Sequence, residues 1–276
     1  MNRTVENGRG TLHLRRLVAD IVSGAAKNHP EAIRAWRAPR EDLRRVATRD
    51  YVRQLRRHLG YRELQEMLRL ARQVWPGFNR RQLTAAPREL FPTRAARVAG
   101  QLRIHLQVKP CGGRDEIALR GFYVEQRPAL LERPLIFVNS AHHPGAVSTT
   151  FCHEIGHHLT APLFEHARSP VHFFFDSAYA AHLNDPAELA ADAICSLAGY
   201  PHPLAVQIFS APRNWALVAK VDKLPDDVFN RVFRLLTDRY GLNLAATIPI
   251  GQRLNYLAGM IHYAKLRWAL LDEYDI

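Results

Sequence analysis

The chain has 276 residues, with 47% hydrophobic and 23% charged side chains and a formal net charge of +12, a balance that excludes a disordered protein and leaves room for one or two domains. No apolar run approaches the roughly 18 residues of a membrane-spanning helix, and the N-terminus lacks the apolar stretch of a secretion signal. Three cysteines without a CxxC pair do not form a disulfide framework, so we expect a protein of the reducing cytoplasm with no membrane partner.

The excess positive charge lies in the first part of the chain. Residues 1–105 contain 23 Arg and Lys against 9 Asp and Glu, a net charge of +14, whereas residues 106–276 contain 15 against 17, a net charge of −2. Such asymmetry indicates nucleic acid as a candidate partner of the N-terminal part. Amphipathic helices with arginine-rich solvated faces give the same composition without any partner.

Helical periodicity dominates the first hundred residues. Val52, Leu55 and Leu59 recur at helical spacing among arginines, and a second apolar stripe follows over residues 64–71. Two helices joined at a glycine resemble a DNA-binding helix-turn-helix only loosely, and ordinary helical hairpins are common. We therefore expect an arginine-rich helical N-terminal region over residues 1–95.

The hydrophobic period changes near residue 100. Apolar runs predict three strands, over residues 104–108, 117–124 and 134–139. A helix is expected to begin near Ala146. Apolar stripes at helical spacing return later and predict a C-terminal helical region packed on the core, over residues 202–276. The pattern as a whole predicts an α+β protein, whose small sheet and functional helices lie in a domain over residues 96–201.

The segment Phe151-Cys152-His153-Glu154-Ile155-Gly156-His157-His158 carries the pattern HExxH. Residues four apart lie on the same face of a helix, so His153 and His157 can offer ring nitrogens to one metal ion. Glu154 is displaced by one position, which lets it approach a water on that ion as general base without ligating the metal. We therefore predict a hydrolytic zinc site, which needs a third protein ligand and an open position for water.

Two candidates for the third ligand follow along the chain. Asp176 lies in a partial echo of the aspzincin pattern, without the glycines of that pattern. Glu188 lies in the first turn of a second helix, for which Asp185 and Pro186 provide the N-cap and the first helical position. This helix is largely apolar and hence buried, so its acids need a cation or hydrogen-bond partners. We therefore predict Glu188 as the ligand, as in gluzincins, and Asp192 as the acid that accepts the other ring N–H of a ligating histidine; Asp176 is the alternative ligand.

Over roughly residues 100–201 these pieces resemble the ImmA/IrrE family of zinc metallopeptidases. The matching parts are a strand that ends in asparagine (Ile136-Phe137-Val138-Asn139), the HExxH helix, and the helix with Glu188-Leu189-Ala190-Ala191-Asp192. Ala190 replaces the second glutamate of the family pattern, and Asp192 replaces its asparagine. The resemblance implies a zincin-like metallopeptidase core, flanked by helical regions, in an intracellular endopeptidase that cleaves a regulatory protein such as a DNA-binding transcriptional repressor.

In the expected mechanism, His153, His157 and Glu188 hold Zn²⁺, and Glu154 carries a proton from the attacking water to the leaving amine. A further donor to the carbonyl oxygen is expected. The candidates for it are His166, His172, Tyr179, His182 and Tyr200. The alternative function is that of a DNA-binding transcriptional regulator, in which the zincin domain is a sensor or a structural module.

Overall fold

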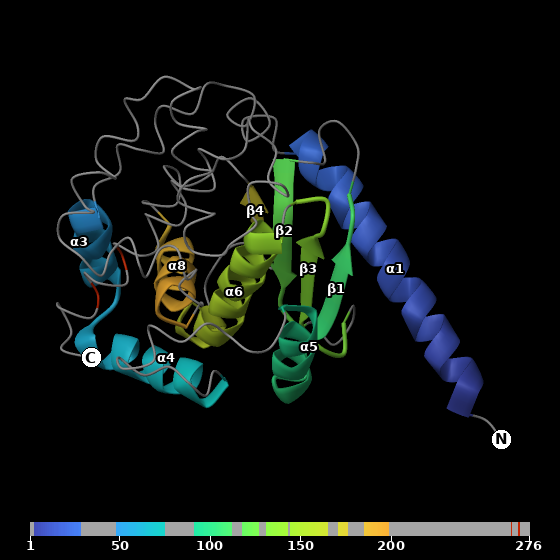
Figure 1. Ribbon diagram of the computed structural model, residues 1–276, viewed down its shortest axis with the longest axis horizontal. Helices are drawn as coiled ribbons and strands as arrows, with labels where there is room; N and C mark the ends of the chain where they lie inside the picture. Colours follow the sequence, from blue (N-terminus) through green and yellow to red (C-terminus); the bar gives the residue numbers. More distant parts are fainter. Residues whose placement is uncertain are drawn as a thin grey trace, which may run out of the picture.

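The computed structural model describes residues 3–28, 48–74, 91–111, 118–126, 131–142, 144–164, 171–175 and 185–198, together with Leu266 and Leu270. The helices are α1 (Arg3–Asn28), α3 (Thr48–His58), α4 (Tyr61–Val74), α5 (Phe91–Gln101), α6 (Pro144–Thr160), the 3₁₀ turn η4 (Ala161–Leu163) and α8 (Pro186–Ala198). The strands are β1 (His105–Lys109), β2 (Leu119–Val124), β3 (Leu135–Asn139) and β4 (Val171–Phe175). In the described ranges the protein is therefore of mixed α+β architecture (Figure 1).

The four strands form one sheet in the order β1-β3-β2-β4. β1 is parallel to β3, whereas β2 is antiparallel to both β3 and β4. The three strands predicted from the sequence are confirmed as β1 to β3, with ends that differ by one or two residues. β4 was not predicted. It pairs with β2 in a register that places His172 opposite Tyr123.

The two faces of the sheet are covered by different helices. Successive side chains of a strand point to opposite faces, so Phe122 and Phe137 pack against α1, while Tyr123, Ile136 and Val138 belong to the core that contains α6 and α8. Figure 1 shows this arrangement, with α1 on one side of the sheet and α6 on the other. The sheet is thus the middle layer of three.

Of the arginine-rich N-terminal region, α3 and α4 pack on the same core as α6 and α8, whereas α1 packs on the other face of the sheet. The predicted stripe of Val52, Leu55 and Leu59 is confirmed, since all three side chains are buried in that core. Leu266 and Leu270 are helical and fully buried in it as well, while the remainder of the predicted C-terminal stripes lies outside the described residues. Of the helices in the described ranges, none combines the length and the apolar composition that a membrane crossing requires.

Asn139, at the end of β3, fixes the segment that leads into α6. Its Oδ1 accepts hydrogen bonds from the backbone N–H groups of Cys111 (2.9 Å) and Ala141 (3.0 Å). Its Nδ2 donates to the carbonyl oxygen of Leu119 at 2.9 Å. The fully buried amide therefore ties β2, β3 and the chain after β1 together.

α6 and α8 lie side by side in antiparallel orientation, with His153 facing Asp192 and His157 facing Glu188. The backbones approach closely at Gly156. A Cβ atom added there would lie 2.6 Å from the carbonyl oxygen and 2.7 Å from the Cα of Ala191. The neighbour is rigid helical backbone that has no room to yield, so only glycine permits this approach. The distance between the two helices therefore depends on one residue without a side chain.

Replacing Gly156 by Ala is expected to lower the free energy of unfolding by about 1–3 kcal/mol, because the added methyl group pushes α8 away from α6. The measurement is chemical denaturation followed by circular dichroism. Gly100→Ala in α5 is the matched control, since nothing lies within 4 Å of its added Cβ, and it should be neutral or stabilising by about 0.5–1 kcal/mol. Equal stability of the two variants would show that the contact is not tight.

Candidate metal centre

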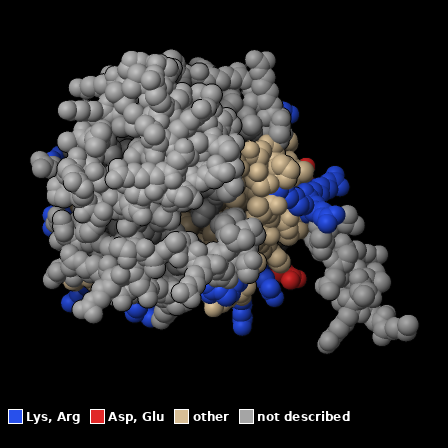
Figure 2. Space-filling view, in the orientation of Figure 1, with Lys and Arg blue, Asp and Glu red and all other residues tan. Residues whose placement is uncertain are grey.

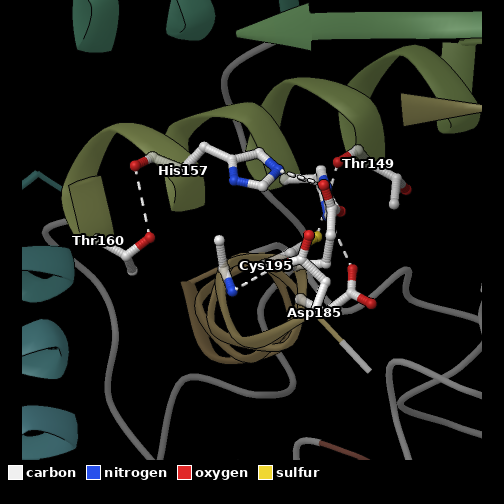
Figure 3. Close-up of polar contacts among 9 residues, drawn as sticks. Thr149, His157, Thr160, Asp185 and Cys195 are labelled. Atoms are coloured by element: carbon white, nitrogen blue, oxygen red, sulfur yellow. Dashed lines mark hydrogen bonds and ion pairs between the residues drawn. The ribbon is translucent and has the colours of Figure 1, made fainter. Parts of the chain in front are cut away.

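α6 presents His153 and His157 on the face that meets α8. The two residues are one helical turn apart, and their Nε2 atoms lie 3.1 Å from each other. The exposed fraction is 0% for His153 and 3% for His157. Figure 3 shows His157 projecting from α6 toward the side chains gathered between the helices, while Thr160 donates a hydrogen bond to the carbonyl oxygen of His157.

α8 supplies Glu188 from its first turn. The predicted N-cap is confirmed, because Asp185 Oδ1 accepts from the backbone N–H of Ala187 at 2.9 Å and of Glu188 at 3.5 Å. This cap fixes the start of α8, and Glu188 in its first turn then faces the histidines of α6. One carboxylate oxygen of Glu188 lies 3.1 Å from His153 Nε2, and the other lies 3.3 Å from His157 Nε2.

His153, His157 and Glu188 form a buried group whose ligand atoms all lie within 4.8 Å of one another. Two imidazole lone pairs and a carboxylate that face one another repel unless a cation lies between them. Ligand atoms at about 2.0–2.1 Å from a tetrahedral zinc ion are about 3.4 Å apart, close to the separations of 3.1 to 3.3 Å found here. The residues therefore fit a divalent metal ion, and their imidazole and carboxylate donors suit zinc and other first-row metals alike.

Asp192 orients the first of these histidines. Its Oδ1 lies 2.8 Å from His153 Nδ1, and both side chains are fully buried. An N–H on Nδ1 that donates to this carboxylate leaves the lone pair of Nε2 directed at Glu188 and His157, as metal binding requires. Burial alone would lower the pKa of His153, but the carboxylates of Asp192 and Glu188 raise it to about 10. The site therefore favours a positive charge at this position.

Glu154 lies under the sheet strand β2 and is fully buried. A Cβ on Gly121 would lie only 3.2 Å from Glu154 Oε1, so the glycine leaves room for the carboxyl group. Among the described residues, neither oxygen of Glu154 has a hydrogen-bond partner. Burial raises the pKa of Glu154 well above its usual range, although the charges of His153 and Arg120 oppose this effect. A buried carboxyl group without partners costs stability, and such groups are typical of acid–base sites.

Two rings of β4 stack on the two histidines of the HExxH segment. The sequence analysis did not predict this strand. The ring of Phe174 stacks on His153 with centroids 4.2 Å apart, and the ring of His172 stacks on His157 at 4.5 Å. The run Val171–Phe175 is β-branched and aromatic, a composition that favours a strand and would have revealed β4. Burial, with the charge of His157, lowers the pKa of His172 to about 4, so its ring is neutral at physiological pH.

Tyr123 of β2 contacts His158, the residue that follows the second histidine of the HExxH segment. The Tyr123 hydroxyl lies 3.2 Å from His158 Nδ1, and the rings meet edge to face. Burial raises the pKa of Tyr123 and lowers that of His158, so this contact joins two neutral groups. His158 therefore interacts with the sheet and does not join the ligand group of His157.

Several residues considered in the sequence have no described position. Asp176, the alternative ligand, lies outside the described residues, as do four of the five candidate donors: His166, Tyr179, His182 and Tyr200. The fifth candidate, His172, is described and lies beside His157. Cys195 lies in the core between α6 and α8, where its thiol donates to the carbonyl oxygen of Thr149 at 3.6 Å (Figure 3).

No protein-family model, curated protein or solved structure matches this chain. What the chain does must therefore be inferred from the geometry of the His153, His157 and Glu188 group itself.

Proposed function

We propose that this protein is a zinc-dependent peptidase with a zincin-like core. The observation that carries the proposal is the meeting of two histidines from an HExxH helix with Glu188 from a second helix, at separations that suit one tetrahedral ion. Three protein ligands leave a fourth position for substrate or water, as in catalytic zinc sites. Structural zinc sites instead fill all four positions with protein ligands.

The roles of the residues follow from this geometry. A zinc ion held by His153, His157 and Glu188 would polarise the scissile carbonyl group and increase the acidity of water. Glu154 lies next in sequence to His153 and has a raised pKa. It accepts a proton from the attacking water at its carboxylate and delivers that proton to the leaving amine. Asp192 holds the His153 ring in the orientation that keeps Nε2 directed at the metal.

The class of substrate follows from the resemblance to the ImmA/IrrE family. It supports hydrolysis of a peptide bond in a regulatory protein, such as a transcriptional repressor, within the cytoplasm. The match in the HExxH segment, in the Glu188 helix and in the strand that ends at Asn139 supports this proposal. Asn139 joins β2 and β3 near the start of α6, so the asparagine of that strand has a clear part in placing the metal helix.

The purified protein is expected to bind one zinc ion, and His153→Ala or Glu188→Ala should each reduce the bound metal strongly, because each removes one of three ligands. Asp192→Asn should retain the ion with about 10–100-fold lower affinity. The measurement is elemental analysis together with a competition titration against a chelator. His13→Ala is the control, since His13 is exposed on α1. Full zinc occupancy in the Glu188→Ala variant would mean that the third ligand is misassigned.

Glu154→Gln should leave the bound zinc unchanged and lower the rate of cleavage by about 10²–10⁴-fold, because the amide cannot accept the proton. The natural substrate is found by comparing protein fragments in cells that express the wild type and the variant. Glu132→Gln, a change at an exposed carboxyl group, is the control and should not alter the fragments. A Glu154→Gln variant that cleaves as fast as the wild type would rule out the mechanism.

A second candidate function, nucleic-acid binding, is favoured by the exposed face of α3. Arg53, Arg56 and Arg57 are exposed there, opposite the buried stripe that anchors the helix. Figure 2 shows Lys and Arg side chains along the edge of the molecule where α3 and α4 lie in Figure 1. Clustered arginines on one helix can contact successive phosphates of a duplex. The basic helices would then bring the peptidase to a protein that is bound to DNA.

Binding of a labelled DNA duplex should weaken steeply with salt, and replacing Arg53, Arg56 and Arg57 by Gln should reduce the slope of log K against log salt by about 0.9 for each lost phosphate contact. Fluorescence anisotropy at several salt concentrations gives this slope. The control variant replaces Arg15 and Arg16, which are exposed on α1. If both variants show the wild-type slope, α3 is not a nucleic-acid interface.

A further inference from the structure

His172 lies on the face of the sheet that carries the metal ligands. It stands directly opposite Tyr123 in the antiparallel pairing of β4 with β2, and directly opposite residues share a face. Phe174, two positions further along β4, lies on that same face under His153 and is fully buried. His172 is only partly buried. On the side of β4 that faces the candidate metal ligands, Phe174 is therefore enclosed in the apolar interior. His172, two residues earlier, is partly exposed.

The contacts of His172 are made by the faces of its ring. The ring stacks on His157 at 4.5 Å with an interplanar angle of 23°, and it lies 6.2 Å from the ring of Tyr123. No hydrogen bond to either of its ring nitrogens is found within the described part of the chain. The stack on His157 uses a face of the ring and leaves the nitrogens on its edge without a hydrogen bond to any described residue.

Other polar side chains on this face have different roles. The hydroxyl of Tyr123 is engaged with His158. The nitrogens of His153 and His157 converge with Glu188 on the metal position, and His172 is not part of that group. His172 is therefore a neighbour of the ligands, held at a fixed distance from them by its stack on His157.

We propose that His172 is a catalytic residue, which donates a ring N–H to the carbonyl oxygen of the scissile peptide bond. The proposal rests on the peptidase function and names the residue that completes it. When the oxygen of water bonds to the carbonyl carbon, the π electrons move to the carbonyl oxygen and charge builds there. The N–H of a fixed imidazole stabilises that charge without giving up its proton. The stack on His157 holds the donor in place before the substrate arrives.

The test uses two substitutions of different chemistry and a small probe that mimics the reacting group. His172→Phe keeps an aromatic ring on His157 but removes the donor, whereas His172→Gln keeps an N–H near the position of the imidazole nitrogen. The protein is loaded with cobalt(II) in place of zinc, and acetohydroxamate is titrated while the visible absorption bands of the metal are recorded. This readout requires neither a known substrate nor turnover.

All three proteins should bind one cobalt ion with the same absorption spectrum. His172→Phe should bind acetohydroxamate about 10–100-fold more weakly than the wild type, because a hydrogen bond to a charged oxygen is lost. His172→Gln should recover most of that affinity.

Each contrary outcome has a distinct meaning. If the Phe variant binds acetohydroxamate as tightly as the wild type, or the Gln variant binds as weakly as the Phe variant, His172 does not act as a donor. If either variant loses cobalt or changes its spectrum, His172 is a metal ligand and the proposed role is wrong. A wild-type protein that binds no cobalt contradicts the peptidase function itself, and this result is separate from the first two.

Discussion

The close approach of α6 to α8 is the constraint on which the site depends. Gly156 lies against the backbone of Ala191 with no space for a methyl group. His157 and Asp192 directly follow these two residues in sequence, and His153 and Glu188 precede them by three positions. The pairs His153–Asp192 and His157–Glu188 then fall within hydrogen-bonding distance. If the helices stood apart by the width of ordinary side chains, these contacts would be lost. The grouping of His153, His157 and Glu188 thus depends on small residues at the helix interface.

Burial determines what the polar residues can do once they are together. Five titratable side chains of α6 and α8, namely His153, Glu154, His157, Glu188 and Asp192, are buried in an otherwise apolar core. Such a group is unfavourable unless the charges compensate one another or bind a cation. The two carboxylates that touch His153 favour positive charge on it, and a divalent ion supplies that charge more completely than one proton does. Glu154 lies beside Gly121 and is not one of the three candidate ligands, but the charges of His153 and Glu188 act on it.

The local parts of this structure could be predicted from sequence, whereas the contacts between distant segments could not. Helical spacing identified His153 and His157, and the Asp185-Pro186 pair located the start of α8. The pairing of β4 with β2 depends on residues about fifty positions apart, for which no local pattern exists. The stacks of His172 and Phe174 on the two histidines follow from that pairing and were missed with it. Gly156 is part of the HExxH segment, but its role depends on its contact with Ala191 in another helix and is not visible in the sequence.

X-ray absorption spectroscopy of the zinc-loaded protein measures which atoms are bound to the metal. Cys152 and Cys195 lie buried between the same two helices as the proposed ligands, so sulfur ligation is the natural rival. The present account predicts only nitrogen and oxygen neighbours at about 2.0–2.1 Å, including the outer-shell scattering of two imidazoles. A sulfur neighbour at about 2.3 Å, or scattering from fewer than two imidazoles, would contradict it.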